Sequence, residues 1–377
     1  MGERIPLCVP DLRGNEAAYL VKCVADNWIS SAGSYVGDLE RAFAQLTRRG
    51  QAIACVNGTA ALQLALLACG IKPGDKVIVP DWTFAATANA VVHAGAEPVF
   101  VDIRADDWTI DPRSVERALD HHGAEIRAIL AVDVLGNLPD PKPLRDLAEA
   151  HDVVLLEDAA GAVGAARDGM PAGMLGDAAI FSLNGNKLVT AGGGGMIVLD
   201  DPEKAAYLRH ITTQARVGGD YRHDAIGFNY RLSNVNAAIG LAQLERIEAM
   251  RADKRRIAER YGQAVAGRED MTFMPVSRPE ESSYWLSNLI VADEASMRDL
   301  VATLNAAAID ARPFWCSLSS QAPYAGFAAE AVPCSLDLTD RTITLPCSSH
   351  LTEAEQDRVL VALDGWRGVP LSDGAAA

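Results

Sequence analysis

Two residues of this chain could do chemistry together, the acid Asp158 and the amine of Lys187. Asp158 and its neighbour Glu157 end the apolar run 153–156, and Lys187 comes soon after a second apolar run, 178–181. Short apolar runs bounded by polar and glycine-rich residues are typical of buried parallel strands. Ligands of open α/β sheets bind just beyond the carboxyl ends of such strands. We therefore expect the carboxylate and the amine to meet over one ligand.

The surroundings of Lys187 favour a reactive amine. The other six lysines occupy polar or charged segments that look like exposed surface, whereas Lys187 has Asn, Gly, Leu and Val as neighbours and no nearby carboxylate. A lysine in apolar surroundings has a lowered pKa, which frees its amine to attack a carbonyl. A Schiff base with pyridoxal 5′-phosphate (PLP) needs such an amine, and it also needs an acid that keeps the pyridine nitrogen protonated. Asp158 suits that second role, whereas strand alternation points Glu157 to the opposite face, where a structural role is expected.

Such a cofactor also needs an anchor for its phosphate. A short strand at 53–56 runs into Asn57, Gly58, Thr59 and Ala60, where a helix begins. Small residues at a strand-to-helix junction leave the first helical amides free, and the helix dipole adds positive potential there. The same residues are equally compatible with an ordinary helix cap made by Asn57 or Thr59.

The remaining candidates are Ser182 for the phosphate and Phe84, or Trp82, for stacking on the ring. Each signal is weak alone, because a lysine after a strand is usually a surface lysine and an aspartate at a strand end is usually a helix cap. Their conjunction in one consistent order is far more specific.

The elements that must position these residues alternate between strand and helix. Strands are predicted at 53–56, 76–79, 98–102, 127–132, 153–156, 178–181 and 196–199, with helices between most of them. This alternation predicts an α/β fold with a mostly parallel sheet covered by helices on both faces.

A smaller C-terminal α+β domain is predicted to follow. Apolar residues at helical spacing over 233–261 predict one long helix that leads into it. Further strands are expected at 285–291 and 341–345, and a helix at 295–307. We therefore expect a large domain at 1–245, with an N-terminal arm, and a smaller one at 246–377, whose last residues, Ser372–Ala377, form a frayed tail.

Bulk composition excludes several classes of function. The chain has 377 residues, 49% of them hydrophobic, and a net charge of −16 that disfavours nucleic-acid binding. No apolar run is long enough to cross a bilayer and the N-terminus lacks a secretory signal, so a cytoplasmic protein is expected. The seven cysteines include no C-x-x-C pair and the seven histidines show no metal-binding spacing, so neither disulfides nor a metal site is expected.

Five segments, taken in order, resemble the DegT/DnrJ-type PLP-dependent sugar aminotransferases, which belong to the fold-type I aminotransferases. The segments are NGTAALQLAL, PDWTFAATANAV, EDAAGAVGA, FSLNGNKLVTAGGGGMI and GFNYRLSNVNAAIGLAQLE. The resemblance runs from the N-terminal arm to about Arg312-Pro313-Phe314 and is most specific over 57–236. It implies a fold-type I aminotransferase with PLP as its cofactor.

The resemblance also implies roles for individual residues. Lys187 would form the Schiff base and Asp158 would pair with the pyridine nitrogen. Asn229 would reach the phosphate in the neighbouring subunit, which implies a homodimer with shared active sites. The other cofactor residues would be Phe84 against the ring and Gly58, Thr59, Ala60 and Ser182 around the phosphate. Trp28, in a Gly/Ser-rich loop, and Arg231 are expected to contact the substrate, although Trp28 could equally anchor the N-terminal arm.

The sequences GNK and TTQAR are most similar to the corresponding segments of members that aminate C4 of nucleotide-linked 4-keto-6-deoxy sugars, on routes to amino sugars and nonulosonic acids. We therefore expect glutamate as the amino donor and a nucleotide-linked keto sugar as the acceptor. Lys187 argues against the dehydratase branch of the family, in which a histidine replaces this lysine. Two alternatives are a non-catalytic or regulatory sugar-nucleotide-binding protein on the same fold, and an aminotransferase for another keto group, such as a cyclitol or a sugar C3.

Three positions depart from the family pattern. Gly161 stands where Gln, His or Glu is common, Asp133 where an H-L-Y/F-G version is usual, and Ser319 where a histidine is common. All three are expected on the sugar side of the site, which is compatible with an unusual acceptor.

Overall fold

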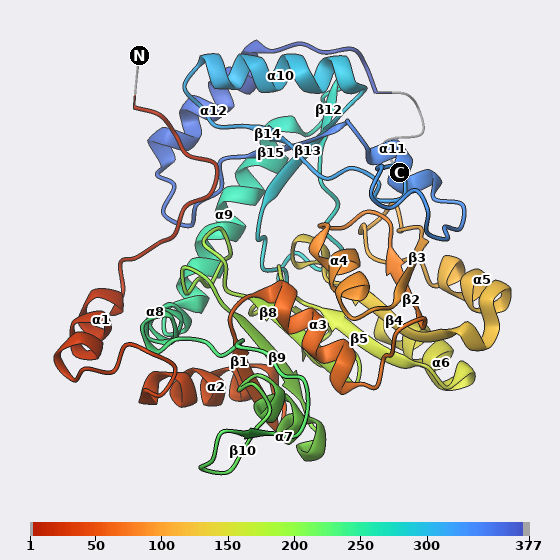
Figure 1. Cartoon of the computed structure of the whole chain (residues 1–377). Helices are drawn as coiled ribbons and strands as arrows, with labels where there is room; N and C mark the ends of the chain where they lie inside the picture. Colours follow the sequence, from red (N-terminus) through yellow and green to blue (C-terminus); the bar gives the residue numbers. More distant parts are fainter. Residues whose placement is uncertain (1–2, 372–377) are drawn as a thin grey trace.

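The computed structural model describes residues 3–371, so the expected frayed tail at 372–377 lies outside the described residues. Its centre is a seven-stranded sheet (Figure 1). The strands are β1 (Gln51–Cys55), β2 (Lys76–Pro80), β3 (Glu97–Val101), β4 (Ile126–Val132), β5 (Val154–Asp158), β8 (Ala178–Ser182) and β9 (Gly195–Leu199). They lie in the order β1-β9-β8-β5-β4-β2-β3, and only β9 runs antiparallel to its neighbours. The predicted mostly parallel sheet is thus confirmed.

Helices cover both faces of this sheet because successive strand side chains point to opposite sides. In β1, Ile53 and Cys55 join the apolar core on one face, and Ala52 and Ala54 join the core on the other. The first face is covered by α3 (Gly58–Ala68), α4 (Ala86–His93) and α7 (Pro202–Ile211). The second is covered by α2 (Ser34–Thr47), α5 (Pro112–His122), α6 (Pro141–His151) and α8 (Asn234–Leu244).

Three of these helices begin with the same Asp-Pro pair. The side chains of Asp111, Asp140 and Asp201 each accept a backbone N–H from the first turn, and the proline that follows occupies the first helical position. An aspartate cap followed by proline satisfies a free amide and presets the helical φ, so these starts are determined locally.

A four-stranded antiparallel sheet forms the second layer, in the order β12-β13-β15-β14. Its strands are β12 (Met271–Phe273), β13 (Ser287–Val291), β14 (Arg312–Pro313) and β15 (Thr342–Leu345). Its helices are α9 (Ile247–Val265), α10 (Glu294–Ala306), α11 (Pro333–Leu338) and α12 (Glu353–Gly365). In Figure 1, α10 and α12 lie on the side away from the large sheet. The domain division at 245/246 falls between α8 and α9 and stays a prediction.

The remaining elements are short. They are α1 (Glu16–Ala25), the two 3₁₀ turns Gly123–Glu125 and Val134–Gly136, and the strand pairs β6 (Ala166–Arg167) with β7 (Met170–Pro171) and β10 (Arg216–Val217) with β11 (Arg222–His223). Among residues 3–371, no helix combines the length and the apolar character needed to cross a membrane.

The single helix predicted over 233–261 is wrong, because α8 ends at Leu244 and α9 begins only at Ile247. Between them, Arg246 has φ −114° and ψ 8°, outside helical geometry. Its guanidinium donates hydrogen bonds of 3.1 and 3.3 Å to the buried carboxylate of Asp11. An apolar repeat shows which residues face the core, but it does not show that the helix axis breaks.

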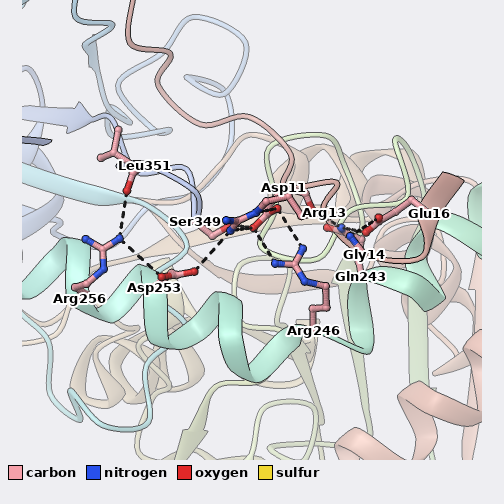
Figure 2. A network of polar contacts seen from close by, with 10 residues as sticks. All are labelled: Asp11, Arg13, Gly14, Glu16, Gln243, Arg246, Asp253, Arg256, Ser349 and Leu351. Carbon is pink, nitrogen blue, oxygen red and sulfur yellow. Dashed lines mark hydrogen bonds and ion pairs between the residues drawn. The ribbon is translucent and has the colours of Figure 1, made fainter. Parts of the chain in front are cut away.

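Asp11 is the centre of a polar network that ties the N-terminal arm to the rest of the chain (Figure 2). Besides Arg246, its carboxylate accepts hydrogen bonds from Arg13 and from the hydroxyl of Ser349, in the segment before α12. Burial alone would raise the pKa of Asp11, but the hydrogen bonds from Arg13 and Arg246 hold that pKa well below its usual range. The arm is therefore fixed against both layers.

One lysine expected on the surface is buried instead. Lys254 lies on the inner stripe of α9, between Met250 and Tyr261, and its amine donates a 2.8 Å hydrogen bond to the carbonyl of Trp285. Its neighbours in sequence are polar because they lie on the charged outer faces of α9. For this reason the sequence wrongly indicated an exposed lysine.

Candidate active site

A cavity of about 470 Å³ lies at the carboxyl ends of the parallel strands. Asp158 and Ser182 end β5 and β8, and Asn57 follows β1. The small sheet contributes Arg312 from β14 and Thr344 from β15 to the same wall. Its volume is typical of small-molecule sites, and its place at the carboxyl edge of the sheet is the one expected from the sequence.

Lys187 lies in the turn after β8 and lines this cavity. Its Nζ atom lies 3.1 Å from the ring centroid of Trp285. Burial lowers the pKa of the amine to about 7, although the negative charges of Asp158 and Cys8 oppose that shift. The neutral form of this amine is therefore far more populated at pH 7 than that of an ordinary lysine.

Asp158 and Glu157 face opposite sides of β5. Asp158 lines the cavity and accepts hydrogen bonds from the hydroxyl of Thr87 at 2.8 Å and the amide of Ala160 at 3.1 Å. Burial raises the pKa of Asp158, and these two hydrogen bonds act in the opposite direction. Glu157 instead accepts the backbone amides of Gly173 and Leu175, both at 2.7 Å. One carboxylate therefore faces the cavity and the other holds a loop.

The start of α3 forms a second polar wall of the cavity. The side chain of Asn57 caps the helix by accepting the amide of Ala60 at 2.8 Å, which leaves the amides of Gly58 and Thr59 without a protein acceptor in the described part of the chain. A Cβ at Gly58 would lie 2.9 Å from Cβ of Ser182, so glycine is what allows α3 to approach β8 this closely. The helix cap and the anion-binding interpretation are therefore compatible. Ala60 is buried and does not line the cavity.

Of the two aromatic residues predicted to stack on the ring, only Phe84 lines the cavity. It is 58% exposed. Trp82, the other candidate, is completely buried, packs against Trp108 at a centroid distance of 4.8 Å and does not line the cavity.

Three predicted site residues lie away from the cavity of their own chain. Trp28 is 53% exposed, and its carbonyl accepts a hydrogen bond from Asn234. Asn229 is exposed and its backbone forms a bridge with Thr213, while Arg231 is exposed and forms one with Cys55. A single chain therefore does not bring these side chains to the other predicted site residues.

The three departures from the family pattern have different surroundings. Gly161 and Asp133 line the cavity, whereas Ser319 does not. Burial and the nearby charge of Glu157 raise the pKa of Asp133 well above its usual range. Ser319 donates its amide to Asp81 at 2.7 Å.

Sequence reasoning missed Trp285, Thr87 and Arg312 as parts of the cavity. The only available signal for Trp285 was the glycine at position 161. A Cβ there would lie 2.7 Å from an indole carbon of Trp285, so the two positions are sterically linked.

The residues present fit PLP. The free amides beside Ser182 suit its phosphate, the buried acid Asp158 suits its ring nitrogen, and Phe84 suits its ring face. The amine of Lys187 faces the same space. Within residues 3–371, no group of three or more His, Cys, Asp or Glu side chains is arranged to hold a metal ion.

Comparison with known proteins agrees with this geometry. Residues 10–364 match the DegT/DnrJ/EryC1/StrS aminotransferase family. The chain is 39% identical to GDP-perosamine synthase of Caulobacter vibrioides, over 96% of this chain and 98% of that one. It is 36% identical to EpsN of Bacillus subtilis, which is named as a pyridoxal phosphate-dependent aminotransferase, over 96% of both chains. The structure of DesI in the presence of its TDP-sugar product superimposes with a TM-score of 0.87 at 29% identity, covering 96% of this chain and 93% of DesI.

The match extends over almost the whole chain and includes both sheets, so it concerns the complete fold rather than one motif. The family and the names of the relatives indicate an enzyme rather than the non-catalytic alternative that the sequence left open. The chain belongs to the DegT/DnrJ/EryC1/StrS aminotransferase family and is a PLP-dependent enzyme of fold type I.

Proposed function

We propose that the enzyme transfers an amino group from glutamate to the keto carbon of a nucleotide-linked 4-keto-6-deoxy sugar. Two findings support this acceptor. The relative from Caulobacter vibrioides is named GDP-perosamine synthase, and DesI was solved with a TDP-sugar product. The single observation that carries the chemistry is that Lys187 and Asp158 line one cavity at the carboxyl edge of the sheet.

Each site residue then has a defined task. Asp158 would keep a proton on the ring nitrogen of the cofactor, and Thr87 and Ala160 hold the carboxylate in position for this. Gly58 and Thr59 would bind the phosphate through their amides and Ser182 through its hydroxyl, and Phe84 would contact the ring. PLP supplies the electron sink that makes the substrate carbon acidic.

Lys187 serves as base and acid in this proposal. A pKa of about 7 would let its Nζ move a proton between the substrate carbon and C4′ of the cofactor at neutral pH. Arg312 is the guanidinium in the cavity wall contributed by the small sheet, and it is suited to a carboxylate or phosphate oxygen of the substrates.

We also propose that the working unit is a homodimer that shares its sites. Asn229 and Arg231 end the segment 212–231, which lies outside the cavity of its own chain. Tyr221 and Ile226 in that segment are 89% and 91% exposed. These exposed apolar side chains are compatible with a surface of this segment that a second subunit covers.

Purified protein with glutamate and a panel of GDP- and TDP-linked 4-keto-6-deoxy sugars, followed by product mass, tests the proposal. We expect conversion of at least one member with stoichiometric formation of 2-oxoglutarate. Amination of a cyclitol ketone or a 3-keto sugar, with none of the 4-keto substrates converted, would contradict it.

A further inference from the structure

Trp285 lines the cavity, and no part of the proposed function uses it. It lies two residues before β13 and is 6% exposed. Its indole forms the surface on which the Lys187 amine rests, 3.1 Å from the ring centroid. A residue in contact with the reactive amine is in a position to control where that amine points.

Three hydrogen bonds hold Trp285 in place, two through its backbone and one through its indole ring. Its backbone amide donates to the carbonyl of Leu135 at 3.2 Å, and its backbone carbonyl accepts from the buried amine of Lys254 at 2.8 Å. Its ring N–H donates to the carbonyl of Asn186 at 2.8 Å. Asn186 directly precedes Lys187, so this last bond couples the indole to the turn that carries the amine.

Gly161 also contacts the space occupied by the indole of Trp285. A Cβ built on Gly161 would lie 2.7 Å from one indole carbon of Trp285 and 3.4 Å from a second. Real Cβ atoms essentially never come this close to a ring carbon, and the ring is fixed by the contacts above. A side chain at 161 and an indole at 285 therefore compete for one volume.

We propose that Trp285 is a positioning residue for Lys187, whose indole fixes the amine against the cavity wall and fills the space that a side chain at position 161 would need. The assignment rests on the role proposed above for Lys187. It also accounts for the glycine at 161, because the absence of a side chain there is the condition for the indole to lie over the amine.

Two opposing effects decide what loss of the indole does to the amine. The ring face attracts the charged form of the amine, whereas burial beneath the ring disfavours that form. Burial is the main cause that lowers the pKa of Lys187 to about 7, and the indole 3.1 Å away contributes to that burial. Opening the site with Trp285→Ala should therefore move the pKa of this amine upward, toward the ordinary lysine value of about 10.4.

The rate at which apoprotein incorporates PLP, followed by absorbance across pH, reports the neutral fraction of the amine without any turnover. We expect a midpoint near pH 7 for the wild type. Trp285→Ala should raise the midpoint by about one pH unit, roughly a third of the difference between an ordinary and a buried lysine. Trp285→Phe keeps a ring against the amine and should stay close to the wild type. Trp315→Ala is the matched control, because Trp315 lines the same cavity with its ring centroid 6.3 Å from that of Trp285.

A double-mutant cycle tests the shared volume. Gly161→Ala should weaken PLP binding. Adding Trp285→Ala to this variant should strengthen PLP binding at least tenfold relative to Gly161→Ala alone, whereas adding Trp315→Ala should not strengthen it. An unchanged midpoint in folded Trp285→Ala, or strictly additive losses in the Gly161→Ala/Trp285→Ala protein, would overturn the assignment. Borohydride trapping separates the two proposals, because a label on a lysine other than Lys187 would refute the proposed function itself.

Discussion

Asp158 and Glu157, the adjacent acids of β5, can be replaced separately to test whether the first has a catalytic role and the second a structural one. Asp158→Asn keeps the shape of the side chain but removes the charge that faces the cavity. Neutralising one partner of a buried charge pair costs about 3–5 kcal/mol. If that cost falls on the transition state, kcat/KM should drop by roughly 10² to 10⁴-fold. The fold should survive, because the asparagine oxygen can accept the amide of Ala160 while its NH₂ group donates to the hydroxyl of Thr87.

Glu157→Gln is the matched control, one residue away on the same strand. Its carboxylate accepts two backbone amides, so a glutamine there leaves one buried N–H facing an NH₂ group. An unsatisfied buried donor costs about 1–3 kcal/mol of folding free energy. We therefore expect a lower urea midpoint and a change in kcat/KM of less than about tenfold.

Steady-state rates with glutamate and an accepted keto sugar, together with urea unfolding of both variants, give the two readouts. The reasoning fails if Asp158→Asn keeps kcat/KM within tenfold of the wild type. It also fails if both variants lose the same activity at unchanged stability, because the two carboxylates would then share one role.

Three further predictions follow from the site and the arm. Ser182→Ala should weaken PLP binding about tenfold through loss of one hydrogen bond to a charged group, measured by absorbance titration, and unchanged affinity would remove Ser182 from the phosphate site. Mixing Asn229→Ala with Lys187→Ala protein should restore about a quarter of wild-type activity. Half of the dimers are then hybrids, and each hybrid has one of its two sites intact. A mixture as inactive as its parents would exclude shared sites. Asp11→Asn should lower the free energy of unfolding by about 2–3 kcal/mol, since it weakens a buried acid bonded to Arg13 and Arg246, and an unchanged urea midpoint would count against this network as the anchor of the arm.

Much of the seven-stranded sheet and its helices could be predicted from the sequence, because the signals that determine them are local. The Asp-Pro pairs mark three helix starts, and short apolar runs mark the strands that end at Asp158 and Ser182. These runs also place the two carboxylates of β5 on opposite faces, since strand side chains alternate. The carboxyl edge of the sheet then brings Asp158, Ser182 and Lys187 to one cavity.

The features that sequence reasoning missed depend on tertiary contacts. Arg246 interrupts a continuous apolar repeat, where it pairs with Asp11 from a distant segment. Lys254 has polar neighbours in sequence yet points inward to the carbonyl of Trp285. Trp285 itself comes from the segment between β12 and β13 of the small sheet, about a hundred residues after Lys187, so no local spacing connects the two.

The central claim is that Lys187 is the residue that carries the cofactor. Borohydride reduction of the PLP-loaded protein, followed by peptide mass analysis, tests it directly because reduction fixes the cofactor to the lysine that holds it. We predict a pyridoxyl mass on the peptide that contains Lys187, and no label in the Lys187→Ala protein. A label on Lys254, the other buried lysine that contacts Trp285, or protein that takes up no cofactor at all, would contradict the account.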